Sequence, residues 1–126
     1  MRNVLERAFE VLGDNVAMTV RALAWARTLP GLSRFVFAST SEVYAGTLAA
    51  HGLAFPTPES TPLVASDLAH PRSSYMLSKI QGEALCHQAG VPFTIVRPHN
   101  VYGPRMGMAH VVPELMKKAW EQPEGG

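Results

Sequence analysis

Residues 73–97 read SSYMLSKIQGEALCHQAGVPFTIVR and contain the two elements that decide the fold. Residues 73–89 have helical composition, and Gly90 followed by Pro92 is the glycine and proline stop expected after a helix. Residues 93–97, FTIVR, are short and rich in β-branched and aromatic residues, which predicts a buried strand. This stretch therefore predicts a helix followed directly by a strand.

The same pair of elements occurs earlier in the chain. Residues 15–27, NVAMTVRALAWAR, place apolar side chains on one helical face, and the Pro30 and Gly31 pair ends that helix. Residues 34–38, RFVFA, follow as another buried strand. This order predicts an α/β fold whose parallel strands are joined by a right-handed crossover, the repeating unit of a doubly wound sheet.

The other segments are a long loop, a last helix and a tail. Residues 39–72 contain four prolines and are expected to be irregular, and a loop of this length inside a compact domain is usually functional. Residues 110–120 are predicted to form a helix with Pro113 in its first turn. We expect residues 121–126 to be a disordered tail.

The composition indicates one globular domain and excludes several classes of protein. The chain has 126 residues, of which 47% are hydrophobic and 17% charged, and its net charge is +1. No basic run supports nucleic-acid binding, and no apolar window is long enough to cross a bilayer. Residues 1–14 also lack the apolar stretch of a signal peptide. We expect a soluble protein that binds neither nucleic acid nor a membrane.

Cysteine and histidine usage bears on the compartment and on metals. The single cysteine, Cys86, cannot form an internal disulfide, so a reducing, cytoplasmic compartment is expected. The five histidines are scattered and none has ligand spacing beside the cysteine, so we expect no metal site. The GxSxG motif of serine hydrolases is missing.

Tyr75 and Lys79 are the first candidates for chemistry. They stand four residues apart on a predicted helix and therefore lie on one face, about one turn apart. An unperturbed tyrosine has a pKa of about 10, and a fixed cation nearby stabilises its phenolate form. The pair is thus a candidate proton acceptor. The alternative is an aromatic residue and a solvated lysine on a surface helix.

A polar cluster follows the strand predicted over residues 34–38. Ser39, Thr40, Ser41 and Glu42 stand at its carboxyl end, the edge at which open α/β sheets bind their ligands. Clusters of this composition are also common in turns, and an exposed glutamate on a turn is the alternative for Glu42.

Three segments together resemble the extended short-chain dehydrogenase/reductases of the NAD-dependent epimerase/dehydratase family, which includes nucleotide-sugar epimerases and UDP-glucuronate decarboxylases. FASTSEVYAG (37–46) is similar to the family's strand-end motif, and SSYMLSKIQGE (73–83) to its tyrosine and lysine helix. VRPHNVYGPRMG (96–107) resembles the segment after its sixth strand. The resemblance covers residues 14–120, with the motifs in the family's order.

The resemblance implies a catalytic role for five residues. Tyr75 accepts the proton of the sugar 4-hydroxyl while hydride passes to NAD, and Lys79 supports the phenolate and holds the nicotinamide ribose. Thr40 hydrogen-bonds the same hydroxyl, and Glu42 acts as acid or base on the 4-keto intermediate. Asn15 matches the asparagine of the family's catalytic tetrad, with a helix cap as the alternative.

Further positions are implied to bind ligands. The implied cofactor contacts, besides Tyr75 and Lys79, are Ser39, Pro98 and His99. The implied substrate contacts are Thr40, Ser41, Asn100 and Arg105. A guanidinium fork suits phosphate oxygens, although a surface arginine after a turn is the alternative for Arg105.

The implied function is a nucleotide-sugar epimerase, dehydratase or decarboxylase that oxidises the sugar transiently at C4, with NAD as cofactor and a UDP-sugar as substrate. No GxGxxG or GxxGxxG occurs in the chain. We therefore expect residues 1–126 to be the catalytic half of a Rossmann-like NAD(P)-binding domain. Its glycine-rich βαβ units should precede Met1 and its substrate-capping region should follow Gly126, so little activity and no tight NAD binding are expected of this chain alone.

A different class of function stays open beside the enzyme. The chain is alternatively a truncated, non-catalytic remnant that serves as a dimerising interaction module. In the family, the helices matching residues 15–27 and 73–89 pack against their mates in a homodimer, and both are apolar enough here to do so.

Overall fold

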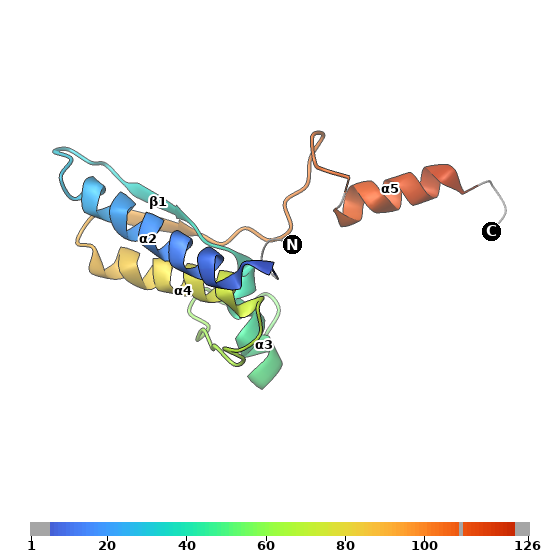
Figure 1. Cartoon of the computed structure of the whole chain (residues 1–126), viewed down its shortest axis with the longest axis horizontal. Coiled ribbons are helices and arrows are strands. Elements are labelled where there is room, and N and C mark those ends of the chain that lie inside the picture. Colours follow the sequence, from blue (N-terminus) through green and yellow to red (C-terminus); the bar gives the residue numbers. More distant parts are fainter. Residues whose placement is uncertain (1–5, 109, 123–126) are drawn as a thin grey trace.

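A computed structural model describes residues 6–108 and 110–122. Within these ranges the fold is mixed α/β, with helices and a small sheet of two parallel strands (Figure 1). The elements are, in order, α2 (Ala8–Ala26), β1 (Phe35–Ala38), the 3-10 helix η1 (Ser41–Tyr44), α3 (Ala45–His51), α4 (Ser73–Gln88), β2 (Phe93–Val96) and α5 (Val111–Glu121).

The sheet has the parallel pairing that the sequence predicts. β1 and β2 run in register, with Phe35 opposite Phe93. Hydrogen bonding continues past the strand ends, since the Ser41 N–H donates to the Pro98 carbonyl at 3.1 Å. The segments that follow the two strands therefore leave the sheet side by side, at the edge where the candidate residues gather.

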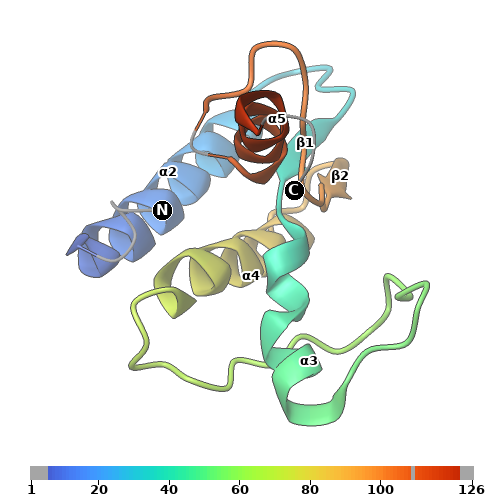
Figure 2. The ribbon, with the colours of Figure 1, turned by 90° about the vertical axis from the view of Figure 1, so that its right-hand side faces the viewer.

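One face of the sheet carries the core. Leu23 of α2, Phe37 of β1 and Cys86 of α4 form one buried cluster, and α2 and α4 lie side by side over it (Figure 2). The alternation of a strand turns the neighbouring side chains the other way, so that Val36 is 61% exposed. The helices thus cover one face of the sheet and leave the opposite face open to solvent.

Gly82 lets α4 lie directly on β1. A Cβ atom at this position would stand 2.2 Å from the ring of Phe37, which is far inside contact distance. Because that ring is itself buried, it has little room to move away. The packing of the helix on the strand therefore requires a glycine here.

We expect Gly82→Ala to destabilise the fold by about 1–3 kcal/mol, because the added methyl group overpacks a filled core. Gly13→Ala is the matched control, since Gly13 also lies in a helix but a methyl group added there would have nothing within 4 Å of it. It should stabilise α2 by about 0.5–1 kcal/mol. Urea unfolding of the two variants measures both values, and equal effects would contradict the packing.

The predicted elements are largely confirmed, with two corrections. The helix predicted over residues 15–27 begins already at Ala8, where Arg7 and Glu10 form an exposed pair at 3.8 Å and the interior Gly13 is tolerated. The loop predicted over residues 39–72 was wrong in its first part, because η1 and α3 occupy residues 41–51. The prolines that argued against regular structure all follow this stretch.

The last helix stands apart from the rest of the fold. α5 matches the helix predicted over residues 110–120 and has Pro113 in its first turn, but none of its residues is buried (Figures 1 and 2). Glu121, predicted to lie in the tail, ends this helix, and residues 123–126 lie outside the described residues. None of the helices described combines the length and apolar character that a bilayer crossing requires.

Candidate active site

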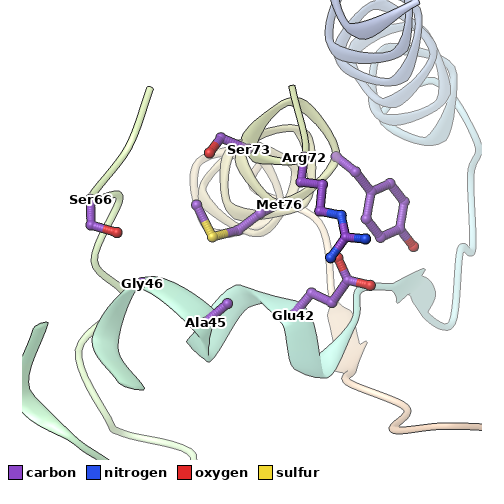
Figure 3. A pocket seen from close by; sticks show the side chains of 8 residues that line it. Glu42, Ala45, Gly46, Ser66, Arg72, Ser73 and Met76 are labelled. Atoms are coloured by element: carbon purple, nitrogen blue, oxygen red, sulfur yellow. The ribbon is translucent and has the colours of Figure 1, made fainter. Parts of the chain in front are cut away.

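A pocket of about 470 Å³ opens beyond the carboxyl end of β1, between η1, the start of α3 and the start of α4 (Figure 3). It contains two residues predicted from the sequence, Glu42 and Tyr75. The residues that line it are Glu42, Ala45, Gly46, Ser66, Arg72, Ser73, Tyr75 and Met76. Its walls therefore come from the two segments that carry the candidate motifs and from the loop between them.

Thr40 orients the segment that carries Glu42. The Thr40 side chain is buried, and its Oγ1 accepts a hydrogen bond of 3.2 Å from the Glu42 N–H, which caps η1. The Glu42 side chain is exposed to the pocket, and Figure 3 shows its carboxylate and the Arg72 guanidinium pointing toward one another. The pocket thus presents a carboxylate and a guanidinium on facing walls.

The ammonium group of Lys79 lies between the end of β1 and the ring of Tyr75. Its Nζ donates to the Ala38 carbonyl at 2.9 Å and lies 5.6 Å from the centroid of the Tyr75 ring. The same atom lies 5.3 Å from the ring of Phe37. Burial among these groups lowers the pKa of Lys79 below its ordinary value. The ammonium is therefore fixed near the phenol ring, as a cation–π contact of modest strength.

Asn15 links α2 to the turn of α4 that carries Tyr75. Its Nδ2 donates to Ser78 Oγ at 3.1 Å, and the Ser78 hydroxyl donates in turn to the Tyr75 carbonyl at 2.7 Å. The alternative of a helix cap is wrong for Asn15, because α2 begins at Ala8 and the asparagine lies inside it.

The structure does not bring all predicted residues to the pocket. The Pro98 carbonyl lies beside Ser41, but neither residue lines the pocket. Residues 98–108 run away from the sheet toward α5 (Figure 1). The side chains of His99, Asn100 and Arg105 are exposed in this segment and contribute nothing to the pocket lining.

A buried ion pair behind the pocket was missed at the sequence level. Glu83 is 4% exposed and receives two hydrogen bonds from Arg97, from Nε to Oε1 at 2.9 Å and from Nη2 to Oε2 at 2.6 Å. The predicted cofactor contact Ser39 donates its hydroxyl to the same Oε1 at 2.5 Å. The available signal was a glutamate one turn after Lys79 and an arginine ending a buried strand.

The pair stays charged despite its burial. Burial raises the pKa of Glu83, but the hydrogen bonds from Arg97 and Ser39 and the positive charge of Arg97 outweigh it, so the net pKa is lowered. The hydrogen bond to Glu83 likewise raises the pKa of Arg97 above its ordinary value. Removing either partner would leave an uncompensated charge in the interior.

Glu83 should make the fold sensitive to acid. Because its folded-state pKa lies below the ordinary value of 4.5, its contribution to stability is complete above pH 4.5 and is lost as the pH falls through the lower, folded value. We expect Glu83→Gln to lower the free energy of unfolding by about 3–5 kcal/mol at neutral pH and to flatten this acid dependence.

Urea unfolding at several pH values measures both effects. Glu114→Gln is the control, because Glu114 pairs with Lys118 at 3.0 Å on an exposed helix and should change stability by less than about 1 kcal/mol. Equal acid profiles for the native chain and Glu83→Gln would contradict this account of the buried pair.

Comparison with known proteins gives the family. The model of the NAD dependent epimerase/dehydratase family matches residues 2–124. The chain belongs to this family. Relatives among the curated proteins share about a third of their residues with it in the matched region. No solved structure shows a significant match.

Three relatives illustrate the range of the family. A UDP-N-acetyl-alpha-D-glucosaminuronate decarboxylase of Bacillus cytotoxicus is 33% identical over 94% of this chain and 36% of its own length. The uncharacterised UDP-glucose epimerase YtcB of Bacillus subtilis is 35% identical over 72% of this chain and 26% of its own length. A dTDP-4-dehydro-6-deoxy-D-allose reductase of Streptomyces bikiniensis is 34% identical over 91% and 36%. The matched part of the chain thus spans between 26% and 36% of the length of these relatives.

Proposed function

We propose that this chain is the catalytic half of an NAD-dependent nucleotide-sugar epimerase, dehydratase or decarboxylase that oxidises the sugar transiently at C4. The observation that carries the proposal is the Lys79 ammonium, 5.6 Å from the ring of Tyr75, beside a pocket that also contains Glu42. We infer further that β1, β2 and their helices belong to a Rossmann-like, doubly wound sheet, whose glycine-rich units lie outside this chain.

Tyr75 and its neighbours move the proton in this proposal. The Tyr75 phenolate accepts the proton of the sugar 4-hydroxyl, and the Lys79 ammonium stabilises the negative charge on the phenolate by its proximity. Asn15 supports the relay through Ser78, whose hydroxyl bonds the Tyr75 carbonyl. Thr40 caps η1 and contributes its hydroxyl to the bound sugar.

Lys79 fits the role of a cofactor contact. Its ammonium has three N–H bonds, and in the part of the chain that the structure describes one of them is used, toward the Ala38 carbonyl. The other two are available to the hydroxyls of a nicotinamide ribose. Ser39, Pro98 and His99 follow the carboxyl ends of the two strands, the side on which open α/β sheets bind ligands. NAD, when bound there, supplies the hydride acceptor.

Glu42 favours decarboxylation or dehydration over simple 4-epimerisation. Its carboxylate faces the pocket, where it can act as acid or base on the oxidised sugar. The proposed substrate is a UDP-sugar, in keeping with the UDP-sugar decarboxylase and epimerase among the relatives. Ser41, Asn100 and Arg105 are the proposed contacts to the nucleotide-sugar, and the buried free thiol of Cys86 suits a reducing cytoplasm.

The test is reconstitution with a polypeptide that supplies the glycine-rich half. We expect Tyr75→Phe to lower kcat on UDP-sugars by about 10²–10⁴-fold, because the proton acceptor is lost. Tyr102→Phe is the control, since Tyr102 is 73% exposed and lies away from the pocket. Equal activity of native and Tyr75→Phe protein would refute the assignment.

Calorimetric titration of this chain alone should show no tight NAD binding. Tight binding would show that the chain does not need a glycine-rich half to bind NAD.

A second candidate function, a dimerising interaction module, is favoured by the outer face of α2. Met18 and Trp25 are seven residues apart and therefore lie on one side of the helix, where they are exposed by 63% and 67%. Apolar side chains gathered on a helix surface are typical of association sites. We infer that α2 and α4 form the contact of a homodimer, with or without catalysis.

Sedimentation measures this association. Trp25→Glu should convert a dimer into a monomer, because a charge at the contact is desolvated without a partner. Trp120→Glu is the control, since Trp120 is 90% exposed but lies on α5. A native chain that is monomeric at all concentrations would exclude the module.

A further inference from the structure

Arg97 joins four segments of the chain behind the pocket. It follows β2 directly and forms the bidentate pair with Glu83 of α4. Its remaining nitrogen, Nη1, donates to the Tyr44 hydroxyl and, at 3.0 Å, to the Glu59 carbonyl. Glu83 extends the network to the end of β1 by accepting the Ser39 hydroxyl.

The two ends of this network lie on α4 and η1, the elements that carry Tyr75 and Glu42 on facing walls of the pocket. Glu83 is two turns along α4 from Tyr75, so the pair is anchored on the helix that carries the candidate proton acceptor. Tyr44 ends η1, two residues after Glu42, and its ring also lies 5.0 Å from the Arg97 guanidinium. One guanidinium therefore connects η1, which carries Glu42, with α4, which carries Tyr75.

Arg97 also fixes the loop that contributes Ser66 to the pocket lining. Its hydrogen bond to the Glu59 carbonyl fixes the start of this loop. The Thr47 hydroxyl fixes the loop further on, because it donates to the Pro62 carbonyl at 2.6 Å and accepts from the Val64 N–H at 3.2 Å. This segment leads to Ser66, which lines the pocket.

We propose that Arg97, held by Glu83, is a positioning residue that sets the η1 wall with Glu42 against the α4 wall with Tyr75. Only a planar fork can serve this role, because the guanidinium bonds a carboxylate, a phenol and a carbonyl in different directions at once. The inference rests on the proposed function only where it says that this geometry governs catalysis. The mechanical coupling of the two walls is independent of any substrate.

Two variants separate positioning from mere stabilisation. Arg97→Lys keeps the charge beside Glu83 but loses the fork, whereas Tyr44→Phe removes one acceptor and leaves the buried pair intact. Arg34→Lys is the matched control, because Arg34 bonds the Phe93 carbonyl and the Thr94 hydroxyl at the opposite end of the sheet.

Amide NMR spectra of the 126-residue chain provide the first readout. With Arg97→Lys and Tyr44→Phe, we expect the signals of Glu42, Ala45 and Gly46 to shift, while those of Leu23 and Cys86 in the core stay in place. Arg34→Lys should leave the pocket signals unchanged. Pocket signals that stay in place with Tyr44→Phe would overturn the proposal. This test needs only Tyr44→Phe, so it remains valid if Arg97→Lys does not fold. Core and pocket signals that shift together would overturn the proposal as well.

Kinetics of the reconstituted enzyme provide the second readout. A misplacement of about 1 Å between the walls should lower kcat on UDP-sugars by about a hundredfold, with a smaller change in KM, for Arg97→Lys but not for Arg34→Lys. If the pocket signals shift and the native protein turns over no nucleotide sugar, the proposed function fails and the coupling stands. If native protein is active and Arg97→Lys retains full kcat, the catalytic part of this inference fails alone.

Discussion

The contact of α4 with β1 is the constraint on which the rest of the structure depends. Gly82 lets the helix approach until its backbone lies against the Phe37 ring. At this separation the side chains one turn before and one residue after the glycine reach the end of the strand. Lys79 bonds the Ala38 carbonyl, and Glu83 receives the Ser39 hydroxyl. One close approach thus places both charges of the site.

Burial disfavours the charged form of both groups, but only Glu83 has a partner that outweighs this effect. For Lys79 it is unopposed by an anion, so the pKa falls and the ammonium is held by a carbonyl and two aromatic rings. For Glu83 it is outweighed by the hydrogen bonds and charge of Arg97, so the carboxylate keeps its charge. The same helix therefore carries a cation beside the Tyr75 ring and, one turn later, a buried carboxylate paired with Arg97.

The local elements of the fold could be predicted from the sequence, whereas the site could be predicted only in part. Gly90 and Pro92 end α4 visibly, so the helix and the strand after it were found. α3 was missed because the prolines beyond it outweighed its own favourable composition. The ion pair between Arg97 and Glu83 depends on the pairing of β1 with β2. The position of Ser66 in the pocket lining depends on the hydrogen bonds that fix an irregular loop. Neither leaves a local signal in the sequence.

The open face of the sheet has a consequence for how such a chain exists in a cell. Val36 and Val96 are 61% and 42% exposed on it, and within the described residues each strand has a free edge. Surfaces of this kind invite pairing with another β-strand, correct or not. The free edges and the apolar face thus form the surface on which a further β-strand would extend this sheet, and the same surface favours aggregation when nothing covers it.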